Sequence, residues 1–109
     1  MKYKVILSID AEFDINDINK YISFVLNEPI IARKKVSKIL QQIKKLDSMP
    51  ARYRVYPYEP LKSQNIHFLP LDNYLIFYVI DDSEKMVTIA RVTYAKREIQ
   101  AIFDNSQDD

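Results

Sequence analysis

Three side chains that can carry chemistry lie close together near the end of the chain. Arg91, Tyr94 and Arg97 fall within seven residues of one another. Two guanidinium groups can stabilise the charge that develops when a phosphodiester is cleaved without a metal, and a tyrosine hydroxyl can pass a proton. The simpler alternatives are that Arg91 is an exposed cation on the face of a sheet, that Tyr94 is a packed aromatic at a strand end, and that Arg97 is a surface arginine at the start of a helix. We take all three as candidate catalytic residues.

A second group of candidates precedes them. His67 is the one histidine of the chain, and histidine has an unperturbed pKa near neutrality. Together with Arg52, Arg54 and Lys62, which can hold phosphates, it is predicted to bind an anionic target. The alternative for His67 is an exposed or lightly bonded strand residue. Three nearby tyrosines either stack on bases or cover the open end of the core: Tyr53, Tyr56 and Tyr58.

The charge is distributed unevenly. The net charge is only +1. Residues 33–62 nevertheless carry nine bases against two acids, and residues 85–97 carry four bases and no acid. Two basic blocks predict a basic face for an anionic partner. The alternative for the first block is a solvated helix face.

The composition excludes several classes of site. The chain of 109 residues has no cysteine and no glycine. Disulfides and thiolate metal sites are therefore excluded, as are glycine-rich phosphate-binding loops. With a single histidine and no acidic cluster, we expect no metal and no cofactor. No apolar run is long enough to span a membrane and no signal peptide is evident, so the expected location is the cytoplasm.

The first half of the sequence predicts a strand and two helices. Residues 2–9 alternate in polarity, as a strand does. Asp10 is the expected N-cap of a first helix, whose apolar residues recur at helical spacing as far as Leu26. Pro29 starts a second helix, which ends near Leu46. Because the connection is short, the two helices should form an antiparallel hairpin.

The second half predicts a long loop and three strands. Residues 47–65 contain three prolines, and a loop of this length is often functional or mobile. A strand begins at Ile66 and is ended or bulged by Pro70. Residues 74–80 are apolar enough for a central strand, and residues 86–92 form the last one.

These elements indicate an α+β fold. Residues 95–103 predict a short C-terminal helix, which completes the order β-α-α-β-β-β-α. An antiparallel sheet should be covered on one face by the α-helical hairpin. The length predicts a single domain over residues 1–109.

Three segments then carry a family resemblance. Residues 11–22 resemble a first helix, residues 69–78 (LPLDNYLIFY) resemble a strand pair around a tyrosine signature, and residues 87–98 (VTIARVTYAKRE) resemble a closing strand and turn. In this order and spacing they resemble the RelE/ParE family, toxins of type II toxin–antitoxin systems that include plasmid stabilisation proteins. The resemblance covers most of the chain outside residues 47–65.

The resemblance implies a growth-inhibiting toxin that is encoded beside an antitoxin, its cognate partner. RelE-type members cut mRNA in the ribosomal A site, whereas ParE-type members poison DNA gyrase. The shared fold does not choose between the ribosome and gyrase as the target. A third alternative is a non-toxic relative that only binds an antitoxin or dimerises.

The resemblance leaves open whether the chain is an enzyme. With the signature tyrosine placed on Tyr74, the strand lysines and strand arginine of RelE-type members fall on apolar residues: Ile66, Phe68 and Leu75. The late arginine is retained as Arg97, and the terminal tyrosine becomes Phe103. A metal-independent endoribonuclease would need a site rebuilt around Arg91, Tyr94 and Arg97. The closing motif fits ParE-type members at least as well.

Overall fold

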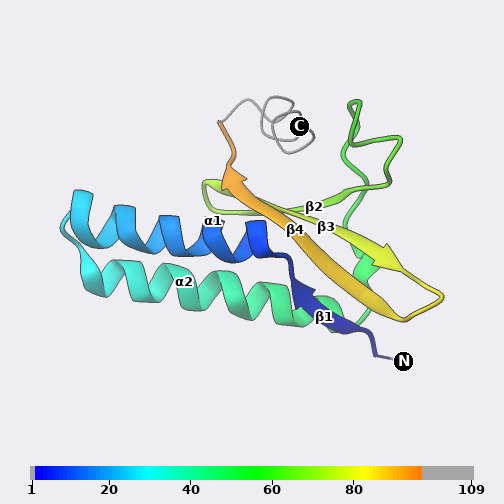
Figure 1. The fold of residues 1–109 in the computed structure, drawn as a ribbon, viewed down its shortest axis with the longest axis horizontal. Helices are drawn as coiled ribbons and strands as arrows, with labels where there is room; N and C mark the ends of the chain where they lie inside the picture. The colour runs from blue at the N-terminus through cyan, green and yellow to red at the C-terminus, as the bar shows by residue number, and fades with distance from the viewer. Residues whose placement is uncertain (1, 97–109) are drawn as a thin grey trace.

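A computed structural model describes residues 2–96, and it shows a helical hairpin packed against a four-stranded sheet (Figure 1). The elements follow in chain order as the sequence predicts, up to the end of the last strand. Their bounds are β1 Lys4–Leu7, α1 Ile9–Lys20, α2 Pro29–Lys44, β2 His67–Leu71, β3 Tyr74–Asp81 and β4 Met86–Tyr94.

The sheet has the strand order β1-β4-β3-β2. β2, β3 and β4 are antiparallel as predicted, whereas β1 joins the edge parallel to β4, so the sheet is mixed. Pro70 does not end or bulge its strand, because β2 continues to Leu71 in unbroken register with β3. β2 is an edge strand among the described residues, so the missing N–H of proline is tolerated there.

The first helix departs from the prediction at both ends. Its N-cap is Ser8, not Asp10: the Ser8 side chain accepts a hydrogen bond from the Ala11 N–H at 3.0 Å. After Lys20 the helix continues as a π-helical segment, Tyr21–Val25, in which the Leu26 N–H bonds to the Tyr21 carbonyl. A π turn contains more residues than an α turn, so the residues beyond it leave the apolar face that helical spacing predicts.

The larger core lies between the hairpin and the sheet. We call it the helix-side core, and it joins one face of the sheet to both helices. Its buried members are Ala11, Ile15, Ile39, Ile43, Leu46, Leu69, Ile76, Tyr78, Val87, Ile89 and Val92.

A smaller cluster lies on the opposite face of the sheet, because neighbouring strand residues point to opposite faces. We call it the loop-side cluster. Two of its members, Tyr56 and Leu61, come from the proline-containing loop, which therefore packs onto the sheet. The full set is Leu61, Ile66 and Phe77, all buried, with Tyr56, Phe68, Leu75 and Val79 packed against them.

The loop tyrosines follow the covering alternative in two of three cases. Tyr53 packs against the helix-side core and Tyr56 against the loop-side cluster, whereas Tyr58 is 68% exposed. Ala95 and Lys96 form a turn after β4, and the rest of the predicted C-terminal helix lies outside the described residues. In the described part of the chain, no helix is both long enough and apolar enough to cross a membrane.

Candidate functional site

Arg91 is held by an acidic side chain of α1. Its Nε donates to Asp14 Oδ2 at 2.8 Å and its Nη2 to Asp14 Oδ1 at 3.0 Å. Both side chains are largely buried, with 18% and 12% of their surface exposed. The hydrogen bond and charge of Asp14 raise the pKa of Arg91. This guanidinium is therefore neutralised within the fold and connects α1 to β4.

The same carboxylate closes part of a sheet edge. β1 covers β4 only as far as Ile89. Beyond that point Asp14 Oδ2 accepts the Val92 N–H at 2.9 Å, and the Ser8 hydroxyl donates to the Ala90 carbonyl at 2.9 Å. Side chains of α1 and its cap thus bond to backbone groups that a longer β1 would have paired.

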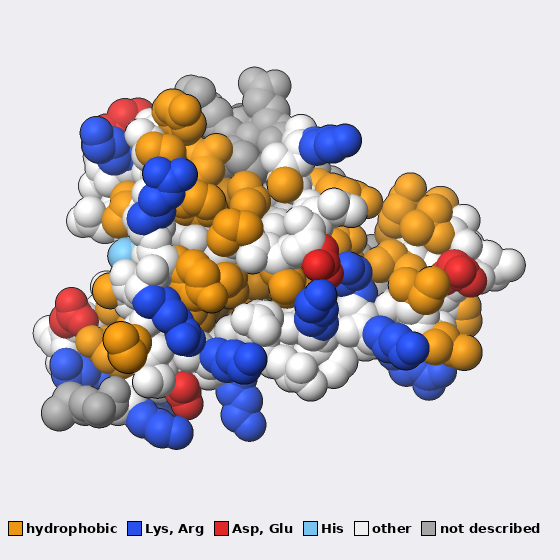
Figure 2. All heavy atoms as spheres, turned by 180° about the vertical axis from the view of Figure 1, so that it is seen from behind, with side chains coloured by type: hydrophobic (Ala, Val, Ile, Leu, Met, Phe, Trp, Pro, Cys, Tyr) orange, Lys and Arg blue, Asp and Glu red, His pale blue; other side chains and the backbone are white. Residues whose placement is uncertain are grey.

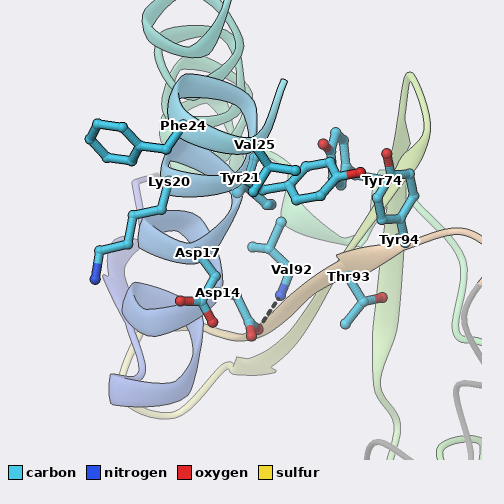
Figure 3. Close-up of a pocket in the computed structure, with 11 residues that line it drawn as sticks. Asp14, Asp17, Lys20, Tyr21, Phe24, Val25, Tyr74, Val92, Thr93 and Tyr94 are labelled. Atoms are coloured by element: carbon cyan, nitrogen blue, oxygen red, sulfur yellow. Dashed lines mark hydrogen bonds between the residues drawn. The ribbon is translucent and has the colours of Figure 1, made fainter. Parts of the chain in front are cut away.

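Tyr94 lies at the end of β4 beside a groove between the hairpin and the sheet. Its ring is 5.1 Å from that of Tyr74, its partner on β3. Burial is the main cause that raises the pKa of Tyr74, and the neighbouring Tyr94 raises it further. Figure 3 shows Tyr21 pointing toward this pair while Phe24 points away from it. This tyrosine groove has a volume of about 670 Å³.

The groove continues into an exposed apolar surface at the end of the hairpin. Phe24 and Val25 are 79% and 67% exposed. Large contiguous apolar patches on a protein surface usually mark an interaction site. We call this surface the hairpin tip, and it consists of Tyr21, Phe24, Val25, Leu26, Ile30 and Ile31.

His67 lies at the other edge of the sheet. Its Nδ1 is 2.6 Å from the Tyr53 carbonyl, and its ring stacks on Tyr78. A carbonyl only accepts, so Nδ1 carries the proton and Nε2 is the acceptor nitrogen in the neutral ring. His67 lines a pocket of about 490 Å³ together with Tyr3 and Asp82.

Two of the loop cations lie over aromatic rings. The Arg52 guanidinium lies over the Tyr53 ring, and that of Arg54 over the Phe68 ring. The Phe68 N–H bonds to the Arg54 carbonyl, which places the two segments side by side. Lys62 is exposed in the turn that follows.

The candidate residues therefore occupy two separate places. Arg91 and Tyr94 are on β4, whereas His67 is on β2, with β3 between them. Arg97 lies outside the described residues. No group of three or more potential metal-ligating side chains occurs within residues 2–96. The catalytic role of Arg91, Tyr94 and Arg97 remains a prediction.

The positions that correspond to the RelE-type strand cations are apolar in space as well as in sequence. They belong to the loop-side cluster, where the loop covers them: Ile66, Phe68 and Leu75. The nearest cation shown there is Arg54, 5.4 Å from the centroid of the Phe68 ring.

Sequence reasoning missed two features. The first is the role of Asp14, because nothing local in the sequence links it to Arg91, which is 77 residues away. The hairpin tip was missed because Val25 and Leu26 fit helical spacing. Their neighbours in the tip, Ile30 and Ile31, follow directly after Pro29 in the first turn of α2, and this apolar pair was the available signal.

Comparisons with known proteins agree with this fold. The sequence matches the family of ParE toxins of type II toxin–antitoxin systems, parDE, over residues 5–99. No curated protein matches it. A chain of the chromosomal ParDE toxin–antitoxin system from P. aeruginosa is similar, with a TM-score of 0.72 and 21% identity over 87% of this chain and 98% of that chain.

Two further structures are similar in fold. One is a chain of a RelBE toxin–antitoxin complex from Mycobacterium tuberculosis, with a TM-score of 0.66 and 18% identity over 88% of this chain and 95% of that chain. The other is a mutant of the E. coli toxin RelE in the free state, with a TM-score of 0.62 and 10% identity over 95% of this chain and 93% of that chain.

Proposed function

The chain belongs to the ParE toxin family of type II toxin–antitoxin systems, and from that premise we propose that it stops growth by poisoning DNA gyrase. In this proposal the chain binds the gyrase–DNA complex as a protein ligand and cleaves no nucleic acid itself. Its cognate antitoxin holds it inactive until the antitoxin is lost.

The loop-side cluster is the observation that carries this proposal. A RelE-type cleavage site needs cations on the sheet to stabilise a charged phosphorane. In this chain the corresponding residues, Ile66, Phe68 and Leu75, are packed with Leu61 and Phe77 beneath the loop. These apolar side chains supply none of the cations that a RelE-type site has at the same positions, and desolvating a phosphate against them is costly.

The state of Arg91 supports the same proposal. Its guanidinium is bound in two places by Asp14 and is mostly buried. A cation that is already paired contributes little to a developing negative charge elsewhere. Arg91 therefore supports the fold of the groove more directly than it supports cleavage.

The tyrosine groove and the hairpin tip fit the antitoxin. The groove runs beside the edge of β4 beyond Ile89, where β1 no longer pairs. Its lining is mainly apolar and also includes Asp17 and Lys20 (Figure 3). An amphipathic segment can place its apolar side chains on such a surface and its polar ones toward solvent. Similar chains have been solved in toxin–antitoxin complexes.

Expression of the full chain under tight induction tests the proposal. We expect growth arrest with gyrase-linked DNA breaks while the cleavage pattern of cellular mRNA stays unchanged. Co-expression of the cognate antitoxin should restore growth, which serves as the control. Codon-phased mRNA cuts that disappear in Arg97→Ala would instead establish a RelE-type nuclease. Unchanged growth would identify a relative without toxicity.

A further inference from the structure

A row of cations runs along the outer side of the hairpin and onto the loop. Figure 2 shows Lys and Arg side chains following α2 and continuing toward the loop. Lys34 and Lys38 of α2, and Lys45 at its C-cap, lie within about 40° of one direction around the helix axis at 100° per residue. The Arg52 Nη2 donates to the Lys45 carbonyl at 2.7 Å and so continues the row. We call Lys34, Lys38, Lys45, Arg52 and Arg54 the basic ridge.

Most of these charges are not neutralised within the fold. Within residues 2–96, Lys38 is the one ridge residue with an acidic partner, and it shares Asp72 with Lys35. The Lys38 side chain nevertheless remains 52% exposed. The other four ridge cations are exposed and have no ion pair in the described part. This differs sharply from Arg91, which Asp14 neutralises.

The two arginines of the ridge are held in position. Arg52 lies over the Tyr53 ring while it donates to the Lys45 carbonyl, and Arg54 lies over the Phe68 ring. Stacking on an aromatic ring restricts a guanidinium and leaves its N–H edge available. A restricted, exposed guanidinium is well suited to bidentate contact with a phosphate.

The length of the ridge fits a nucleic-acid backbone. From Lys34 to Lys45 the helix axis advances about 16 Å at 1.5 Å per residue, and one strand of B-DNA presents about five phosphates over that length. We propose that the basic ridge binds the phosphate backbone of duplex DNA. The contact is independent of base sequence, because lysines and stacked arginines on a ridge reach phosphates rather than base edges.

The surroundings of the ridge favour a nucleic acid over an acidic polypeptide. Besides Lys38, the exposed residues between Lys34 and Lys45 are Ser37, Leu40, Gln41 and Lys44, so one apolar side chain stands among polar and charged ones. An amphipathic peptide needs an apolar surface, and the hairpin tip and the tyrosine groove offer one elsewhere. The ridge offers charge without such a surface, which suits a polyanion whose attraction is electrostatic.

The DNA contact rests on the proposed function in one respect, because gyrase is the place where the chain would meet duplex DNA. A poison of gyrase acts where the enzyme holds duplex DNA, so the ridge adds a DNA contact to the protein contact. Binding to DNA alone needs no gyrase. It can therefore succeed or fail separately from the appearance of gyrase-linked breaks in cells.

The test compares two double variants with the same change in charge. Lys45→Glu/Arg54→Glu alters the ridge, and Arg33→Glu/Lys44→Glu alters two exposed cations on another side of α2. Each pair exchanges one lysine and one arginine for glutamate. Binding of the full chain to a mixed-sequence duplex of about 30 base pairs is measured by fluorescence anisotropy across a salt series, with circular dichroism as the check on folding.

We expect the ridge variant to lose at least tenfold in affinity at about 100 mM salt, and the slope of log K against log salt to fall by about 2. The control variant should lose less than threefold. Equal losses in both variants would overturn the proposal, as would tighter binding of polyglutamate than of the duplex. An RNA duplex serves as a further probe, and equal ridge dependence for it would support a backbone contact.

Discussion

Two apolar regions of this molecule differ in whether the chain itself covers them. The loop-side cluster is covered by the chain itself, with Leu61 and Phe77 at 1% and 0% exposure. The hairpin tip is not covered, and Phe24 and Val25 are 79% and 67% exposed. Both regions draw on large aliphatic and aromatic side chains. The difference lies in whether another segment of the chain packs on them.

This difference indicates where a partner is needed. The covered region occupies the face on which a RelE-type enzyme presents its cations, so that face is used for stability. The uncovered region adjoins the tyrosine groove at the open part of the β4 edge. The apolar surface left available for binding is therefore on the helix side.

The largest expected effect comes from the same substitution made in each region. Leu61→Ala removes a fully buried side chain and should lower the free energy of unfolding by about 2–5 kcal/mol. Leu26→Ala removes a side chain that is 51% exposed, and it should change that free energy by less than about 0.5 kcal/mol. Urea denaturation of both variants measures the difference.

In antitoxin affinity the order of the two variants should be reversed, with the larger loss in Leu26→Ala. Leu26→Ala should weaken the complex with the cognate antitoxin several-fold while the fold stays intact, because the lost side chain belongs to the hairpin tip. Folded Leu61→Ala should bind the antitoxin as the unaltered chain does. Equal antitoxin affinity for Leu26→Ala and the unaltered chain would remove the tip from the interface.

The next effect concerns the ion pair beside the groove. Asp14→Ala leaves the Arg91 guanidinium and the Val92 N–H without their shared acceptor. Removal of one partner of a mostly buried pair should cost about 3 kcal/mol of unfolding free energy. Because α1 and β4 flank the groove, antitoxin affinity should fall as well. Chemical denaturation and a binding titration measure the two losses.

A double variant separates the pair from its neighbours. In Asp14→Ala/Arg91→Leu no unpaired cation remains, so the loss should be smaller than in Asp14→Ala alone. Additive losses from the two single substitutions would mean that Asp14 acts on the backbone of β4 and not through Arg91.

Local patterns predicted the fold well because each element has a clear signal. The alternation at residues 2–9, Pro29 at the start of α2 and the apolar run at residues 74–80 each correspond to an observed element. The π-helical segment has no such signal. Its consequence, the exposure of Val25, depends on where the turn of the helix is widened.

The candidate site was less predictable, because its properties depend on contacts between distant residues. Whether Arg91 is free or neutralised depends on Asp14, and whether Phe68 faces solvent depends on the packing of Leu61. Sequence spacing groups Arg91 with Tyr94 but does not show either partner. The cations of the loop were easier to foresee, since exposed charge needs no specific partner.

The smallest effect at neutral pH concerns Tyr78, which joins the helix-side core to the loop. Its ring belongs to the helix-side core and stacks on His67, and its hydroxyl donates to the Pro50 carbonyl of the loop at 2.6 Å. Tyr78→Phe should cost about 1 kcal/mol at pH 7, because the carbonyl loses its donor.

The alkaline range tests how strongly the buried site of Tyr78 favours its neutral hydroxyl. Burial raises the pKa of Tyr78 from 10.0 to about 12. The neutral hydroxyl is favoured by the folded state, so its contribution is complete below pH 10 and is lost as the pH rises through about 12. That loss is on the order of 2–3 kcal/mol. The unfolding free energy of the unaltered chain should therefore fall more steeply between pH 10 and 12 than that of Tyr78→Phe, in urea titrations at each pH. Parallel curves would show that Tyr78 ionises equally well in the folded and unfolded chain.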